Sequence, residues 1–291
     1  MKTTFIRLLT LVLSLLLTLC FIACSDTTTD PGSSDHNAAD STPGTTAWNV
    51  TFTGDDWSAP AEAAITQDGN VTLLTKAGTY RISGTLNDGQ IRVRVPKTEK
   101  VTLIFDNLTA ASSTTSPVYI ESADKVTVEL ADGTTNTLSD TPNYVFNGTD
   151  TKPNACLYSS EDITFKGDGK LIVNANYNNG IGSKNDLKIK GGSYEINAVK
   201  NALKGNDSVT IESGTILITR CNDGIKTDAT ETGRGILTIS GGTIEIHAED
   251  DGLQASQKID VTGGLITVEA LGKVTNCDGE TNIATGCLVE K

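Results

Sequence analysis

The sequence Asn178-Asn179-Gly180-Ile181 returns three times along the chain, as Lys200-Asn201-Ala202-Leu203, Asn222-Asp223-Gly224-Ile225 and Asp250-Asp251-Gly252-Leu253. The first two intervals are 22 residues and the third is 28, because six extra residues fall in the loop-like stretch 228–235. A second marker keeps the same spacing, as Gly191-Gly192, Ser213-Gly214, Gly241-Gly242 and Gly263-Gly264. A fixed period of this length is typical of a solenoid, in which each repeat packs on its neighbours.

The contents of each repeat indicate which solenoid this is. Leu187-Lys188-Ile189 precedes the first Gly-Gly pair and Tyr194-Glu195-Ile196 follows it, and later repeats carry similar runs. Alternation rich in Ile, Val and Thr predicts short strands. No window has a helical period, and the Leu-x-x-Leu-x-Leu pattern of leucine-rich repeats is absent. We therefore expect an all-β, single-stranded parallel β-helix of about 22 residues per coil, with the apolar residues Ile181, Leu203, Ile225 and Leu253 stacked inside.

The N-terminal segment predicts export. Lys2 and Arg7 precede an apolar stretch from Leu8 to Leu19, which is the pattern of a signal peptide, and Ala23 before Cys24 resembles a bacterial lipobox. We expect a lipoprotein signal peptide at 1–23, a lipidated Cys24, a disordered tether at 24–46 and the β-helix domain at 47–291. The alternative is an uncleaved anchor helix. The location that follows is the bacterial cell envelope, on the outer membrane and surface-exposed, with the lipid as the only membrane attachment.

Charge and cysteine content narrow the possible functions. The formal net charge is −13, and removal of Lys2 and Arg7 with the signal peptide makes it −15. A chain this acidic, with no basic patch, is not expected to bind nucleic acid, and we expect a monomer. Only two histidines are present, which argues against a zinc site or a histidine-based triad. Cys277 and Cys287 are close enough in sequence to pair, whereas Cys156 and Cys221 are not expected to pair.

Equivalent residues of successive coils should form ladders, and one ladder carries acids. Stacking would bring Asp223 and Asp251 to about 5 Å, where two carboxylates repel by roughly 3 kcal/mol at an effective dielectric near 20. A proton or a cation would relieve this repulsion. With Asp250 beside them and Asn222 or Asn201 assisting, all ligands are hard oxygens, which suits Ca²⁺. The alternative is that the Asp-Gly pairs are turns with solvated carboxylates, and Asn179 and Asn201 are an asparagine ladder.

Other side chains near these corners are candidates for contact with a sugar polymer. Lys204 and Lys226 would meet the carboxylates of an acidic polysaccharide, or would simply pair with neighbouring acids on a solvated face. Tyr158 and Tyr177 would stack on sugar rings, although tyrosine is also a good strand residue.

The chain resembles a known family at these corners, at its Gly-Gly-Thr-Ile turns, and at the stretches 78–86 and 136–140. It is similar to the polysaccharide-lyase-like, calcium-associated carbohydrate-binding β-helix family of bacterial surface proteins, over residues 65–270. The resemblance implies a right-handed parallel β-helix, bound calcium, and affinity for plant-type polysaccharides, including cellulose and acidic pectic chains. It implies no established catalysis. The chain departs at Asn201-Ala202-Leu203, which lacks the Asp-Gly pair, and this weakens a calcium site at that coil.

Three functions follow from these observations. The first is a surface-anchored protein that binds plant-type or acidic polysaccharide with the help of calcium. The second is a pectate-lyase-like eliminase, in which a cation acidifies a uronate proton and Lys226, Lys204 or Arg220 serves as the base. The third is a structural adhesin without a sugar ligand. We assign no catalytic residue from the sequence.

Overall fold

The computed structural model describes residues 36–39, 48–53, 64–146 and 152–291. The expected signal peptide and Cys24 lie outside the described residues, as does most of the expected tether. One short strand, β1 (His36–Ala39), falls within the segment expected as tether and pairs antiparallel with β2 (Trp48–Thr53). Among the described residues, no helix is long and apolar enough to cross a membrane.

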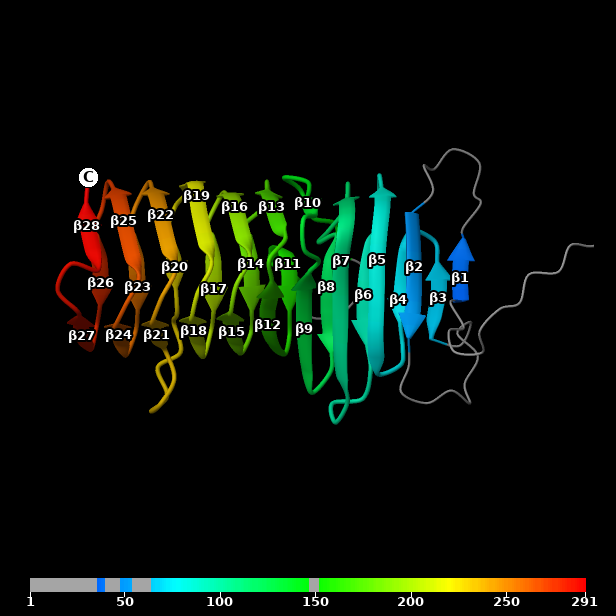
Figure 1. Cartoon of the computed structure of the whole chain (residues 1–291), viewed down its shortest axis with the longest axis horizontal. Coiled ribbons are helices and arrows are strands. Elements are labelled where there is room, and N and C mark those ends of the chain that lie inside the picture. Colours follow the sequence, from blue (N-terminus) through cyan, green and yellow to red (C-terminus); the bar gives the residue numbers. More distant parts are fainter. Residues whose placement is uncertain (1–35, 40–47, 54–63, 147–151) are drawn as a thin grey trace, which may run out of the picture. The chain divides into compact units, whose positions relative to one another are not determined.

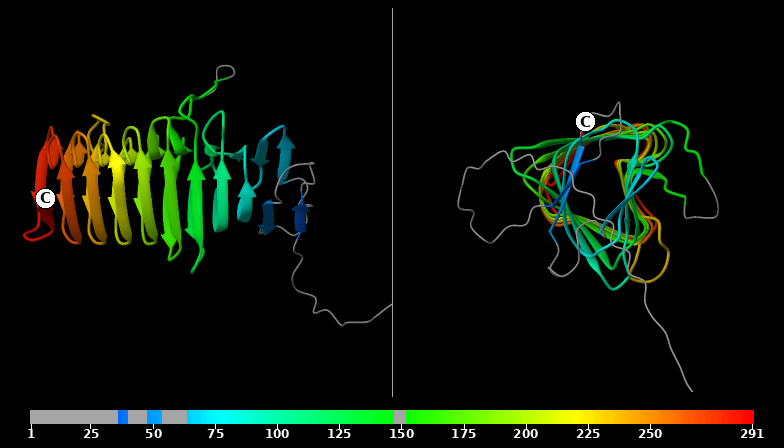
Figure 2. Two further views of the ribbon diagram at one scale, coloured as in Figure 1. Left: turned by 90° about the horizontal axis from the view of Figure 1, so that it is seen from above. Right: turned by 90° about the vertical axis from the view of Figure 1, so that its right-hand side faces the viewer.

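The described chain contains strands and no helix, and its parallel strands stack as a β-solenoid of about nine turns with about 23 residues per turn (Figure 1). This confirms the parallel β-helix predicted from the 22-residue period. The strands form three faces, as the view along the stack shows (Figure 2).

The first face is a separate sheet, here called the ten-strand face. Its strands are β3 (Ile65–Asp68), β4 (Val71–Leu74), β6 (Gln90–Arg94), β8 (Val118–Ser122), β11 (Ala155–Ser159), β14 (Asn179–Ser183), β17 (Leu203–Gly205), β20 (Ile225–Lys226), β23 (Leu253–Ala255) and β26 (Thr275–Cys277).

The other two faces belong to one sheet because the long strands β5 (Gly78–Leu86) and β7 (Lys100–Ala111) continue from one face to the next. The second face adds β9 (Lys125–Leu130), β12 (Asp162–Gly167), β15 (Asp186–Ile189), β18 (Ser208–Ile211), β21 (Ile236–Ile239), β24 (Lys258–Val261) and β27 (Glu280–Ile283). The third face adds β10 (Thr135–Ser139), β13 (Lys170–Ala175), β16 (Ser193–Ala198), β19 (Thr215–Cys221), β22 (Thr243–Ala248), β25 (Leu265–Ala270) and β28 (Leu288–Glu290).

The core is a set of apolar ladders. On the ten-strand face, each inward residue pairs in register with its equivalent in the next coil and is fully buried, as expected, in the order Leu157, Ile181, Leu203, Ile225 and Leu253. Alternating burial in strands such as β13 shows the same arrangement on the other faces. Each Å² of apolar area removed from water stabilises the folded state by roughly 25 cal/mol. Because each coil buries the apolar residues of its neighbours, stacking stabilises the whole solenoid.

The Gly-Gly marker has a backbone cause. Gly192, Gly214, Gly242 and Gly264 have φ between 91° and 116°, a region that side chains other than glycine rarely adopt. A Cβ at Gly214 would also lie 2.9 Å from the carbonyl oxygen of Gly192 in the preceding coil. The repeat keeps glycine at this turn for both reasons.

The four cysteines in the described part of the chain are not paired in disulfides. Cys156 and Cys221 are buried free thiols on distant coils. Cys277 and Cys287, which were close enough in sequence to pair, are also free.

Two insertions interrupt the regular coils. Residues 228–235 form the loop between β20 and β21, at the position expected from the 28-residue interval. A longer connection links β10 to β11, and its described parts leave the stack of coils as the green segment in Figure 2.

Candidate functional site

The candidate site lies at the corner that leads from the third face into the ten-strand face, and we call it the polar corner. Backbone hydrogen bonds of 2.8 Å join it from coil to coil: Lys200 N to Asn178 O, Asn222 N to Lys200 O, Asp250 N to Asn222 O, and Gly272 N to Asp250 O. The corner is therefore as regular as the strands that flank it. Regular stacking is what brings the repeated polar side chains together.

A side-chain ladder runs inside this corner. The amide nitrogen of the Asn201 side chain donates to Asn179 Oδ1 at 2.6 Å, and the backbone N–H of Asn201 donates to the same oxygen at 3.2 Å. This is the stacked contact expected of an asparagine ladder, and it ties Asn201 to the preceding coil. In the next coils the acceptor is a carboxylate: Asp251 N donates to Asp223 Oδ1 at 3.4 Å, and Lys273 N to Asp251 Oδ1 at 2.9 Å.

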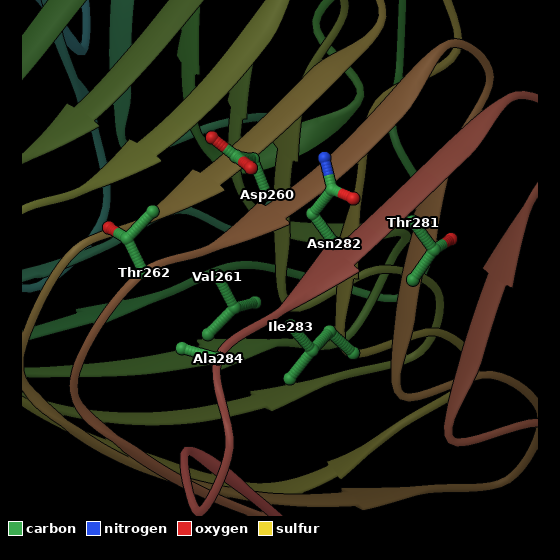
Figure 3. Close-up of a pocket in the computed structure, with 7 residues that line it drawn as sticks. All are labelled: Asp260, Val261, Thr262, Thr281, Asn282, Ile283 and Ala284. Atoms are coloured by element: carbon green, nitrogen blue, oxygen red, sulfur yellow. The ribbon is translucent and has the colours of Figure 1, made fainter.

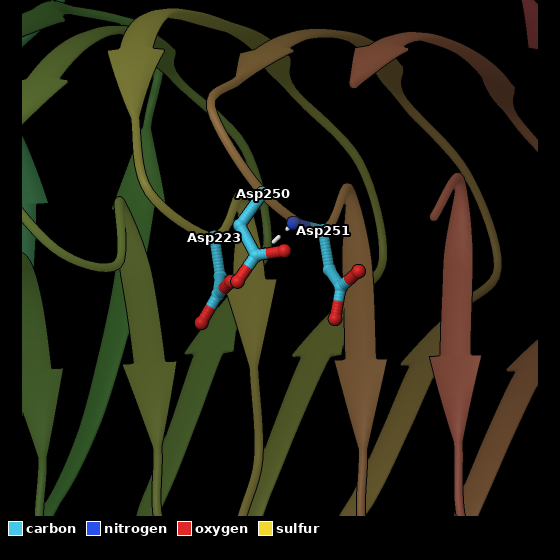
Figure 4. A group of neighbouring side chains, drawn as sticks. All are labelled: Asp223, Asp250 and Asp251. Atoms are coloured by element: carbon cyan, nitrogen blue, oxygen red, sulfur yellow. Dashed lines mark hydrogen bonds between the residues drawn. The ribbon is translucent and has the colours of Figure 1, made fainter. Parts of the chain in front are cut away.

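Three acids meet where the ladder changes from amide to carboxylate. Asp223, Asp250 and Asp251 each offer one carboxylate oxygen such that these oxygens lie within 4.8 Å of one another (Figure 4). Asp223 and Asp251 are buried, with 4% and 5% of their surface exposed, whereas Asp250 is exposed. The structure thus brings together the three acids that the sequence analysis selected.

The buried carboxylates are already hydrogen-bonded. Asp223 accepts from Lys226 Nζ at 3.0 Å and from Asn222 Nδ2 at 3.1 Å. Asp251 accepts from Asn276 Nδ2 at 2.6 Å. Among the described residues, the ion pair of this cluster joins Lys226 to Asp223 alone, so net negative charge remains at the corner.

The donor set fits a hard divalent cation. Calcium binds oxygen at 2.3–2.6 Å, so two oxygens on opposite sides of one ion lie about 5 Å apart, which is compatible with the 4.8 Å limit observed here. The cluster contains no sulfur and no imidazole, the ligands that softer metals prefer. Of the two expected assisting residues, Asn222 touches Asp223 directly, whereas Asn201 is engaged with Asn179.

The lysines of the neighbouring row are ion-paired. Lys204 and Lys226 lie side by side in register on the ten-strand face, each about three-quarters buried. Lys204 Nζ lies 2.6 Å from Asp228 Oδ2, in the inserted loop, and Lys226 is held by Asp223. Arg220 Nε lies 2.8 Å from Glu249 Oε1. All three candidate bases for an eliminase are thus engaged with carboxylates.

The two tyrosines have different surroundings. Tyr158 lies in register with Tyr119, and the two rings are in tilted contact at 5.8 Å. Only 7% of Tyr158 is exposed, and burial raises the pKa of its hydroxyl. Its expected role in stacking on sugar rings is not supported, because too little of the ring is accessible. Tyr177 is half-buried at the polar corner and stacks on Tyr144.

The sequence analysis did not select Tyr144, Phe146 or Asp140. These residues begin the connection between β10 and β11, where the 22-residue period is interrupted. The signal available was the aromatic pair in Tyr144-Val145-Phe146 within an otherwise polar loop.

A shallow pocket of about 520 Å³ lies elsewhere, on the second face at the last coil (Figure 3). It is lined by residues of β24 and β27 and the turns after them: Asp260, Val261, Thr262, Thr281, Asn282, Ile283 and Ala284. Its one acid, Asp260, lies 3.5 Å from Lys258. Nothing in this pocket gathers several charged or metal-binding groups, in contrast to the polar corner.

Comparison with known proteins identifies the family. Residues 67–287 match the family of carbohydrate-binding domain-containing proteins. The chain belongs to this carbohydrate-binding domain family.

Two relatives agree with this assignment. A carbohydrate-binding domain-containing protein from Acetivibrio thermocellus is 42% identical over 241 residues, covering 82% of this chain and 84% of the relative. The solved structure of a polysaccharide lyase-like protein from C. thermocellum, a gadolinium derivative, superposes with a TM-score of 0.76 at 45% identity, covering 78% of this chain and 93% of that one. The resemblance to a polysaccharide-lyase-like carbohydrate-binding family is confirmed, and the polar corner lies within the matched region of this carbohydrate-binding domain.

Proposed function

We propose that this carbohydrate-binding domain binds acidic polysaccharide through a calcium ion held at the polar corner by Asp223, Asp250 and Asp251, with Asn222 assisting. A calcium ion with open coordination positions accepts carboxylate oxygens of a uronate chain, and so bridges protein and polymer. Lys204 and Lys226, in the adjacent row, would contact such a chain by exchanging their ion pairs with Asp228 and Asp223 for its carboxylates. The ligand is a plant-type or acidic polysaccharide.

The observation that carries the proposal is the meeting of three carboxylates at one corner of a carbohydrate-binding domain. Two of them are buried, and of these Asp223 is paired with a lysine, Lys226. Without a cation, such an arrangement is repulsive. A net charge of −13 would also repel an acidic polymer unless a cation intervened.

The solved relative is compatible with this proposal. It was obtained as a gadolinium derivative, and gadolinium is a hard trivalent cation that takes oxygen ligands. A relative that takes up such an ion is compatible with oxygen-lined cation sites in this family.

The cellular placement rests on the sequence alone. We propose that Cys24 is lipidated and that the domain acts as a monomer on the outer membrane, exposed at the cell surface. Mass spectrometry of the mature N-terminus tests this, since a lipid-modified Cys24 is expected as the first residue. An intact Met1 or cleavage at another position would contradict it, and sedimentation of the purified protein tests the monomer.

The binding function is tested by polysaccharide pull-down with calcium and with chelator. Retention on polygalacturonate is expected in calcium and reduced retention in chelator. The double substitution Asp223→Asn with Asp251→Asn should remove the calcium-dependent part. Asp260→Asn is the matched control, because it removes a carboxylate on the second face and should leave retention unchanged.

The same incubation separates binding from catalysis. An eliminase would release unsaturated uronate products, which absorb in the ultraviolet. We expect none, because Lys204, Lys226 and Arg220 are all ion-paired with carboxylates. If the protein is retained on no polysaccharide, either in calcium or in chelator, the result would instead favour the adhesin alternative.

A further inference from the structure

Three aromatic rings gather outside the core, at the first coil of the polar corner. Tyr144 and Phe146 come from the connection between β10 and β11, and Tyr177 comes from the corner between β13 and β14. Tyr144 and Tyr177 are stacked, with ring centroids 4.0 Å apart and planes 13° apart. Phe146 meets them edge-on, at 6.0 Å from Tyr144 and 6.4 Å from Tyr177. We call these three residues the aromatic patch.

The distances show how the rings lie. Phe146 is nearly equally far from the two stacked rings, so it lies beside the stack and not on top of it. Phe146 therefore covers neither outer face of the stack. Tyr177 and Phe146 are only half-buried, and Val145 between the two loop aromatics is 58% exposed.

The patch is held by a buried carboxylate. Tyr144 Oη donates to Asp140 Oδ2 at 2.6 Å, and the backbone N–H of Asn176 donates to Asp140 Oδ1 at 2.5 Å. Asp140 is 7% exposed. One side chain thus fixes both the loop that carries Tyr144 and the corner that carries Tyr177, so the stack is formed before any ligand arrives.

Tyr177 lies in a corner that is longer than its neighbour in the next coil. Ala175 pairs with Ala198 and Ile181 pairs with Leu203, so the corner of Tyr177 contains one residue more than the next corner. The next corner carries Val199, which is 50% exposed. Exposed apolar side chains that gather on an acidic protein are a mark of a binding surface.

The patch lies on the path that leads to the three acids. Along the polar corner, Tyr177 stands two coils before Asp223 and three coils before Asp251. At about 4.8 Å per coil this is roughly 10–15 Å, the reach of a few linked sugar rings. A polymer that runs along the solenoid axis can therefore touch the patch and the acids together.

We propose that the aromatic patch is a stacking subsite for a pyranose ring of a polysaccharide chain that runs along the polar corner. The C–H face of the sugar packs on the outer face of the Tyr144–Tyr177 stack, and Phe146 borders it. This inference rests on the proposed function and deepens it, because it adds a second contact and a direction for the chain. The ring contact itself needs no charge, so it contributes with calcium and with chelator and to neutral as well as acidic polymers, while Lys152, whose Nζ lies 5.3 Å from the Phe146 ring centroid, borders the patch.

The test is affinity electrophoresis of the full-length protein in gels that contain a soluble neutral β-glucan or polygalacturonate, with calcium or with chelator. Tyr177→Leu and Phe146→Leu should each weaken binding to both polymers by roughly three- to tenfold in both conditions. Tyr177→Phe keeps the ring and should bind like the parent. Leu265→Ala, which trims a 48% exposed side chain on the third face, is the control for loss of apolar surface.

The outcomes separate this inference from the proposed function. If the leucine variants bind like the parent while Asp223→Asn with Asp251→Asn loses calcium-dependent binding, the patch only anchors its loop and the inference is wrong. If Tyr177→Phe loses as much affinity as Tyr177→Leu, stacking is also wrong. If the parent binds neither polymer, the proposed function fails with it. Thermal melting of each variant checks that it remains folded, as expected for Phe146→Leu, since a phenylalanine side chain carries no hydrogen-bonding group.

Discussion

Lys226 Nζ lies 3.0 Å from Asp223 Oδ2, so a carboxylate proposed to hold calcium already holds a cation of the protein itself. The two cations compete for one buried acid. Calcium binding would have to displace the ammonium group or share the carboxylate with it. The calcium site can therefore be tested by a substitution that is expected to strengthen binding.

Removing the competing lysine should strengthen calcium binding. Lys226→Met removes the ammonium group from Asp223 Oδ2. We expect the calcium affinity, measured by calorimetry, to rise about tenfold, which corresponds to a competing interaction of about 1.4 kcal/mol. In chelator the same variant should melt at a lower temperature than the parent, because a buried carboxylate loses its partner. Lys204→Met is the control, since Lys204 pairs with Asp228 outside the cluster. Unchanged or weaker calcium affinity in Lys226→Met would argue against the corner as the site.

Calcium should also stabilise the fold. A ligand that binds only the folded state adds about 2.7 kcal/mol at a hundredfold excess over its Kd, so calcium should raise the melting temperature and chelator should lower it. Asp223→Asn with Asp251→Asn should abolish this response and still fold, because Asn179 and Asn201 occupy the same ladder in earlier coils. Differential scanning calorimetry measures both. A double variant that responds to calcium like the parent would show that the Asp-Gly corners are turns only.

The inward ladder should be sensitive to truncation. Leu203 is fully buried between Ile181 and Ile225, and Leu203→Ala should lower the free energy of unfolding by about 2–5 kcal/mol. Val199→Ala, four residues earlier, should change it by less than about 0.5 kcal/mol, because half of that side chain is exposed. Urea unfolding followed by circular dichroism gives both values. Equal effects would mean that the inward assignment is wrong.

The sequence was sufficient to predict the positions of residues that recur in every repeat. Ile181, Leu203 and Ile225 share a position in the period, so their stacking inside the helix was predictable, and so was the approach of Asp223 to Asp251. In a solenoid, residues one period apart in the sequence are neighbours in space, because each repeat packs on the next. The fold and the acidic corner therefore followed from the spacing of the repeats together with the residue types that each repeat contains.

Contacts outside the period could not be predicted in this way. Tyr144 reaches Tyr177 from an insertion whose path no repeat specifies. Tyr158 occupies an outward position, which suggested an accessible ring, but Tyr119 of the preceding coil packs on it. Outward positions are exposed only where nothing folds over them, and that depends on loops and neighbouring side chains that the pattern does not contain.

Asp140 should make stability depend on pH in the opposite sense to an ordinary salt-bridged acid. Burial raises the pKa of its carboxyl above the usual 3.8, and the hydrogen bonds from Tyr144 and Asn176 offset this only in part. The folded state therefore binds the proton more tightly than the unfolded state. The charged carboxylate destabilises the fold at neutral pH, and this cost disappears as the pH falls through the raised pKa toward the unfolded value.

The comparison that isolates this effect is the parent against Asp140→Asn, which cannot ionise. Both are unfolded in urea at pH 7, 5.5 and 4 in the presence of chelator, so that calcium binding does not contribute. We expect the free energy of unfolding of the parent, relative to the variant, to increase steadily as the pH is lowered. Asp278→Asn, at an exposed position of the last coil, is the control and should show no such trend. A parent that instead loses stability relative to Asp140→Asn on acidification would show that the hydrogen bonds outweigh burial, and that Asp140 holds the aromatic patch as a stabilised anion.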